Sequence, residues 1–137
     1  MDWQNLAYTA VQVAHNFGAA AVVGGALFAQ WPAQPDPDTR RKLAWLVLFG
    51  WMVQGASGAA FGAISYLGYG QLPDIHAIAI AALLIKMACA VAGFLLAAAY
   101  LRAAAMWTEA GRNHAWSTLL GLGATALAAA AFLRWFS

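Results

Sequence analysis

Four long apolar stretches constrain this chain more than any other feature. About 20 mainly apolar residues are needed for one helix to cross a bilayer. Counted between the breaks made by proline, glycine and charged residues, the stretches cover approximately 6–30, 43–66, 75–101 and 116–133. The sequence therefore predicts an all-α fold, an integral membrane four-helix bundle that forms a single transmembrane domain over 1–137.

Composition excludes the soluble alternatives. Apolar residues make up 64% of the chain and charged residues 9%, whereas a soluble domain is nearer half apolar and about a quarter charged. The net charge of +2 is too small for a phosphate-binding patch, so we expect a lipid bilayer and no nucleic acid as a partner. A single cysteine, Cys89, rules out a disulfide within the chain and a multi-cysteine metal site.

Prolines, glycines and polar residues separate the stretches. Three prolines lie within Trp31–Asp38, and prolines do not continue a helix. Asp38 or Thr39 is then expected to cap the second helix. A second break, rich in glycine, ends at Asp74, which is expected to cap the third helix. The third break covers 108–113.

Basic residues predict the orientation. Most of them fall in the first and third loops, as Arg40, Arg41, Lys42, Arg102 and Arg112. Cytoplasmic loops carry an excess of lysine and arginine. We therefore expect both termini on the outer, periplasmic side of a bacterial inner (cytoplasmic) membrane, which the chain crosses several times.

A few polar residues lie inside the predicted spans, and each is a functional hypothesis because polar groups are costly in hydrocarbon. His15 shares a helix face with Gln12 and Asn16. At 1.5 Å per residue, His15 lies roughly 12 Å, and Gln54 and Lys86 about 18 Å, below the outer boundary. We predict that His15, Gln54 and Lys86 form one polar cluster in the outer half or the middle of the bundle.

The histidines and Lys86 are the candidate site residues. Neutral imidazole is a common ligand of metals and of haem iron, so His15 is either such a ligand or an interhelical hydrogen-bonding residue. His76, at the outer mouth of the third span, is either a second ligand or an interfacial residue. His114 is expected at the surface of the cytoplasmic end. Lys86 is too central to reach water easily and needs a partner, such as a porphyrin propionate or a carboxylate of another subunit.

Small residues suggest how the helices pack. Gly50, Gln54, Gly58 and Gly62 recur every four residues along the second span. Small side chains let helix backbones approach closely in lipid. The stripe serves either as an ordinary contact within the bundle or as a docking face for a membrane protein partner or a second copy in a homo-oligomer.

The segment Val13–Phe28, with His15 followed by Gly24 and Gly25, resembles the first helix of bacterial copper-resistance D (CopD) membrane domains. It is also similar to the first helix of the membrane-bound, four-helix protoporphyrinogen oxidases of the HemJ type. The basic entry to the second span, and Lys86 mid-way along the third, resemble both families. The resemblance implies that His15 is a haem or metal ligand and that Lys86 is its functional companion. It departs from both at Val23, where a tryptophan is expected.

We favour a small haem b or porphyrin-binding redox protein. His15 would be an axial ligand, and His76 the second metal ligand. Gln54 and Lys86 would help to bind the cofactor. Electron transfer fits this hypothesis, and so does oxidation of a porphyrinogen or a quinol with Lys86 as the catalytic residue.

Two other functions stay open. One is a cofactor-free accessory subunit that braces a larger membrane complex, which the abundance of alanine favours. The other is copper transport or handling, with His15 and His76 on the route of the ion. Cys89 and Met87 add little to a copper site, because residues two apart diverge on a helix. The sequence does not decide whether the protein is an enzyme.

Overall fold

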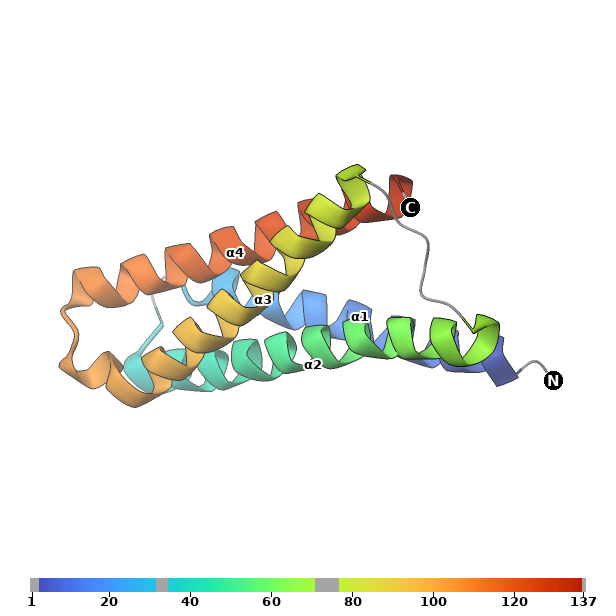
Figure 1. The fold of residues 1–137 in the computed structure, drawn as a ribbon. Coiled ribbons are helices and arrows are strands. Elements are labelled where there is room, and N and C mark those ends of the chain that lie inside the picture. Colours follow the sequence, from blue (N-terminus) through green and yellow to red (C-terminus); the bar gives the residue numbers. More distant parts are fainter. Residues whose placement is uncertain (1–2, 32–34, 71–76, 137) are drawn as a thin grey trace.

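The structure, a computed structural model, describes residues 3–31, 35–70 and 77–136. These residues form four long helices and one short 3-10 helix (Figure 1): α1 (Trp3–Phe28), α2 (Pro37–Tyr69), α3 (Ala77–Ala103), η1 (Ala104–Met106) and α4 (Glu109–Trp135). All four long helices are long and apolar enough to cross a membrane. The predicted all-α, four-helix membrane architecture is therefore confirmed.

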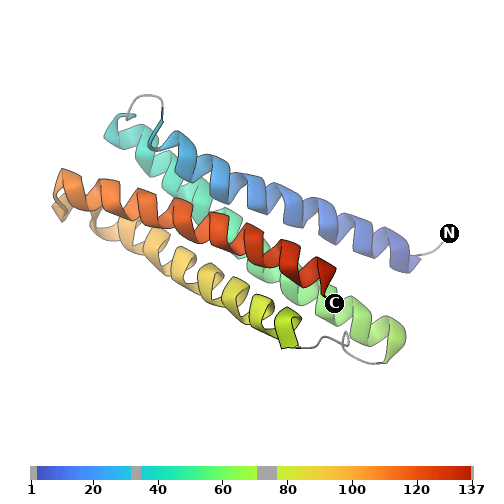
Figure 2. The same ribbon diagram turned by 90° about the horizontal axis from the view of Figure 1, so that it is seen from above.

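The helices are arranged as two antiparallel pairs. The most extensive contacts join α1 to α2 and α3 to α4, and fewer contacts join α2 to α3 and α1 to α4. Figures 1 and 2 show the pairs close together at the end where α3 turns into α4. We call this the loop end. The pairs diverge toward the other end, the termini end, where both chain termini lie.

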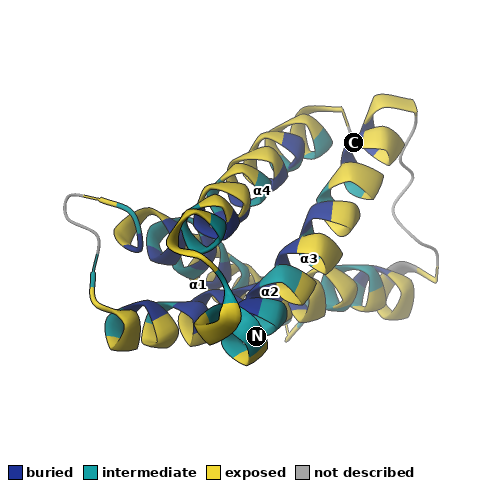
Figure 3. Ribbon diagram, turned by 90° about the vertical axis from the view of Figure 1, so that its left-hand side faces the viewer, coloured by how far each residue is buried: buried dark blue, intermediate teal, exposed yellow. Residues whose placement is uncertain are grey.

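Packing is tightest toward the loop end. Val47, Trp116 and Leu119 are fully buried there. The ring of Tyr100 meets the ring of Trp116 edge-on, with centroids 5.0 Å apart. Buried faces point between the helices and exposed faces point outward (Figure 3). This half of the bundle fixes the relative position of the two pairs.

Glycines allow the closest helix contacts. A Cβ atom added to Gly50 would lie 3.1 Å from the carbonyl oxygen of Gly18. A Cβ atom added to Gly93 would lie 2.2 Å from Cε2 of Trp51. Part of the glycine stripe on the second span therefore makes ordinary contacts within the bundle, as one of the two interpretations predicted.

The second helix starts earlier than expected. Asp36 is the N-cap and Pro37 is the first helical residue. The Asp36 carboxylate accepts a hydrogen bond from the Thr39 backbone N–H at 3.0 Å and another from the Thr39 hydroxyl at 2.7 Å. The prediction that Asp38 or Thr39 caps this helix is wrong, because proline is well suited to the first helical position. Asp74, the expected cap of the third helix, lies outside the described residues.

The fourth helix also starts earlier, at Glu109 rather than near Trp116. Thr108 is its N-cap, and the Thr108 hydroxyl accepts a hydrogen bond from the Gly111 backbone N–H at 3.1 Å. The polar residues that suggested a long break therefore form a capped first turn. Because this turn is polar, a search for long apolar stretches does not detect it.

Arginines at the loop end bind the ends of helices. Each donates a side-chain hydrogen bond to a backbone carbonyl at or just beyond a helix C-terminus. The pairs are Arg40 with Ala29 at 3.2 Å, Arg41 with Leu101 at 3.1 Å, and Arg112 with Trp107 at 2.7 Å. Cations are favourable at helix C-termini because the last carbonyls carry partial negative charge.

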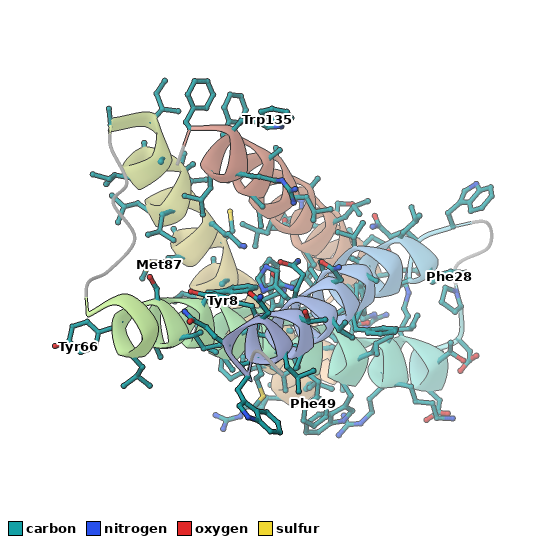
Figure 4. All side chains as sticks on the ribbon, turned by 90° about the vertical axis from the view of Figure 1, so that its right-hand side faces the viewer. Tyr8, Phe28, Phe49, Tyr66, Met87 and Trp135 are labelled. Carbon is teal, nitrogen blue, oxygen red and sulfur yellow. The ribbon has the colours of Figure 1, made fainter. Side chains whose placement is uncertain are left out.

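Large apolar side chains cover the outside of the bundle. Phe49, Tyr66 and Trp135 point away from it (Figure 4). Leu67 and Trp135 are 83% and 82% exposed. Such a surface is stable only in contact with lipid or with another apolar surface. The structure therefore supports a multi-pass protein in contact with the bilayer.

Candidate functional site

Two ionisable side chains from different helix pairs meet inside the bundle. Nε2 of His15, on α1, lies 2.9 Å from Nζ of Lys86, on α3. The residues are 71 positions apart in the sequence. The imidazole is half-buried, and so is Lys86. This contact bridges the region where the two helix pairs begin to diverge.

Gln54 contacts the backbone of α1 at His15. Its side-chain Nε2 donates a hydrogen bond of 2.5 Å to the carbonyl oxygen of His15. The Gln54 side chain is buried on α2. The structure therefore brings His15, Gln54 and Lys86 together, as the depth argument predicted. Gln54 contacts the backbone of His15 through its amide nitrogen, which indicates that it positions α1.

Ser57 completes the cluster and was not among the predicted site residues. Its Oγ lies 2.6 Å from Nδ1 of His15. Ser57 is buried on α2, three residues after Gln54. The sequence could have indicated Ser57, because a spacing of three residues places it on the same helix face as Gln54. Both ring nitrogens of His15 therefore have polar partners.

Aromatic rings close one side of the imidazole. Phe61 meets the His15 ring edge-on, with centroids 5.7 Å apart. Tyr8 in turn stacks on Phe61, with centroids 6.3 Å apart. The Phe61 and Tyr8 rings limit the rotation of the His15 ring and so help to keep it in the orientation that its hydrogen bonds require.

The polar neighbours of His15 on α1 do not join the cluster. Nε2 of Gln12 donates a hydrogen bond of 2.8 Å to Oδ1 of Asn16, and this pair is exposed. Gln12 and Asn16 lie on the predicted face of the helix, one turn apart. Their mutual hydrogen bond makes this exposed part of α1 polar.

An open glycine face lies beside the cluster. Trp51, Gly55, Gly58 and Gly62 follow one another at spacings of four and three, so they share one face of α2. Trp51 packs on Gly93 of α3. Apart from neighbouring residues of α2 itself, no atom of the described residues lies within 4 Å of a Cβ atom placed on any of the other three glycines. The other described helices therefore leave this face uncovered toward the termini end.

Of the cluster residues, Gln54 alone lines a described cavity. A void of about 10 Å³ at the bundle centre is lined by residues that include Val22, Trp51 and Gly123, which is room for one water molecule at most. An apolar groove of about 300 Å³ runs along α3 and α4, lined by residues that include Ile85 and Phe132. Neither His15 nor Lys86 lines either of them.

The remaining predicted residues are elsewhere. His76 lies outside the described residues. His114 is exposed on the first turns of α4, at the loop end, and is remote from His15 as predicted. Cys89 is buried while Met87 is exposed, so the two side chains diverge. Among the described residues, no three His, Cys, Asp or Glu side chains are close enough to hold a metal ion together.

A haem iron bound at His15 would take one ring nitrogen as its axial ligand. Haem iron takes one or two protein ligands, and a histidine is common. Ligating histidines usually bond through one ring nitrogen and are oriented by a hydrogen bond at the other. His15 has this arrangement, with Ser57 at Nδ1. Lys86 faces Nε2, so ligation there requires the lysine side chain to turn away.

Comparisons with known proteins identify no relative. No protein-family model matches the chain, and no curated protein or solved structure matches it significantly. The resemblance of the first helix to the copper-resistance and oxidase families stays a prediction.

Proposed function

We propose that this protein is a small redox protein of the membrane that binds haem b or a porphyrin at His15. The observation that supports it best is the imidazole inside the bundle, with Ser57 at Nδ1 and Nε2 turned toward α3. An ionisable residue within a membrane span is a functional-site hypothesis by default, because a charged side chain is costly in hydrocarbon. Haem iron would supply one-electron chemistry, for electron transfer or for oxidation of a porphyrinogen or a quinol.

Lys86 is the companion of the cofactor in this proposal. An ammonium group inside a bilayer needs an anionic or polar partner. The acidic side chains that the structure describes, Asp36, Asp38 and Glu109, all lie at the loop end. A porphyrin propionate would supply the missing negative charge. Gln54 would keep α1 in place while Lys86 turns from the imidazole to the carboxylate.

An accessory role in a larger complex is the second candidate. The uncovered glycine face of α2 favours it, because small residues are the usual contact surface between membrane helices. This role needs no cofactor and is compatible with a homo-oligomer. Copper handling has less support, because the described residues offer His15 but no cluster of three ligands.

The orientation belongs to the same proposal. The loop end carries Arg40, Arg41, Lys42, Arg102 and Arg112, and the termini end carries Arg134. By the positive-inside rule the loop end is cytoplasmic. The termini end then faces the periplasm, in the inner membrane of a bacterium.

The deciding experiment is a reduced-minus-oxidised optical spectrum of the detergent-purified protein, from cells with ample haem supply. We expect a Soret band and sharp α and β bands in wild type. These bands should disappear in His15→Ala and persist in His114→Ala, which removes an exposed histidine at the loop end. Lys86→Met should bind haem more weakly. A flat spectrum from folded wild-type protein would sink the haem proposal and leave the accessory role, for which co-purifying proteins are the readout.

A further inference from the structure

Ser57 has one hydroxyl proton, two very close neighbours and a more distant third, the carbonyl oxygen of Gln54, which lies 3.3 Å from its Oγ. Its Oγ lies 2.5 Å from the carbonyl oxygen of Val53, one turn earlier on α2, and 2.6 Å from Nδ1 of His15. At such distances a proton must lie between the two atoms, since two lone pairs would repel each other. One hydroxyl proton serves one of these contacts. The other contact needs a proton from the partner.

The carbonyl oxygen of Val53 has no proton to give. The Ser57 hydroxyl therefore donates to Val53, and Nδ1–H of His15 donates to Ser57 Oγ. A neutral imidazole carries one ring proton, so Nε2 keeps its lone pair. That lone pair accepts the hydrogen bond from Nζ of Lys86 at 2.9 Å. All of these contacts agree on one tautomer of His15.

We propose that Ser57 is the positioning residue of the site: it accepts Nδ1–H, holds His15 in the Nδ1–H tautomer and aims the Nε2 lone pair at α3. The tautomer follows from these contacts for a neutral ring, while its use to bind iron rests on the proposed function. Hydrogen bonds of this kind keep ligating histidines in the correct tautomer and orientation. Ser57 is anchored in turn by its own bond to the helix backbone.

The test is ¹⁵N NMR of the imidazole rings in haem-free, detergent-solubilised protein labelled at histidine. The loss of one ring signal in His15→Gln assigns His15. In wild type we expect a protonated Nδ1 and an unprotonated Nε2. In Ser57→Ala the proton should move to Nε2 in a large share of the molecules. Ser57→Thr should restore the wild-type pattern, because a threonine hydroxyl also bonds the preceding turn of a helix.

Ser65→Ala is the matched control, because Ser65 is another buried serine of α2, two turns further on. Its His15 signals should equal those of wild type. A proton on Nε2 in wild type overturns the proposal without any variant. So does a folded Ser57→Ala protein, judged by its helical circular dichroism, that keeps the wild-type tautomer.

A haem titration of the same proteins separates this inference from the proposed function. Loss of a residue that orients a metal ligand weakens metal binding about 10- to 100-fold, which is the loss expected for Ser57→Ala. Ser57→Thr and Ser65→Ala should bind as wild type does. If wild type carries Nδ1–H but binds no haem, the tautomer stands and the haem function fails. If wild type binds haem and Ser57→Ala binds it equally well, the positioning role fails.

Discussion

The amine of Lys86 meets an imidazole nitrogen rather than a carboxylate. A lysine amine offers two or three N–H groups according to its charge, and Nε2 of His15 takes one of them. Within the part of the chain that the structure describes, the other N–H groups of Lys86 have no partner and are open to a water molecule, a ligand or another protein. A group that places oxygen atoms next to the Lys86 amine, above all an anion, binds there more favourably than an apolar group does.

Asp36 makes the stability of the loop end depend on pH. Its hydrogen bonds from Thr39 hold the pKa of the Asp36 carboxyl below its usual value. The carboxylate therefore stabilises the fold at pH values above the pKa of an unfolded aspartate, about 3.9. This stabilisation is lost as the pH falls through the lower pKa of the folded state. We expect Asp36→Ala to lower the melting temperature at neutral pH, with a smaller effect near pH 2.

Circular dichroism melting curves in detergent between pH 2 and pH 7 measure this effect. Asp36→Asn keeps an acceptor for the Thr39 N–H and is a good N-cap. It should retain most of the stability at neutral pH and lose the part of the acid dependence that Asp36 causes. Equal acid dependence in wild type and Asp36→Asn would contradict the assignment.

At the scale of the helices, the contact of α2 with α3 depends on Gly93. A Cβ atom there would lie 2.2 Å from Cε2 of the buried Trp51 ring. Overpacking of this kind costs roughly 1–3 kcal/mol, so Gly93→Ala should lower the melting temperature. Because α3 carries Lys86, the displaced helix should also weaken haem binding. Thermal unfolding in detergent and the haem titration are the measurements.

Gly55→Ala is the control for Gly93→Ala. Among the described residues, none outside the neighbouring part of α2 has an atom within 4 Å of a Cβ atom placed on Gly55. Alanine is the better helix former by about 1 kcal/mol, so this variant should be neutral or slightly stabilising. A Gly93→Ala protein as stable as Gly55→Ala would show that the α2–α3 contact is looser than described.

Hydrophobicity predicted the helices better than it predicted where they start. Spans are found by apolar length, but α2 and α4 each start in a polar turn capped by Asp36 or Thr108. Depth along a helix was enough to predict that His15 and Lys86 meet. The role of Ser57 depends on rotation about the helix axis and on angles between helices. A single sequence does not contain these quantities.

The whole molecule has two ends of different character. The loop end is closely packed and bound by arginines, whereas the termini end is open. We expect the loop end in the cytoplasm. In a Cys89→Ala background, Phe136→Cys, beyond the last span at the termini end, should react with a membrane-impermeant maleimide in intact spheroplasts. Trp31→Cys, between the first two spans at the loop end, should react only after lysis. The reverse pattern would invert the orientation.

The division of the site between the two helix pairs sets the order in which it is built. A chain is synthesised from its N-terminus. His15, Gln54 and Ser57 all belong to α1 and α2, so all three are translated before Lys86. The contacts that orient the imidazole therefore lie within the first helix pair, and the second pair adds the amine that faces Nε2.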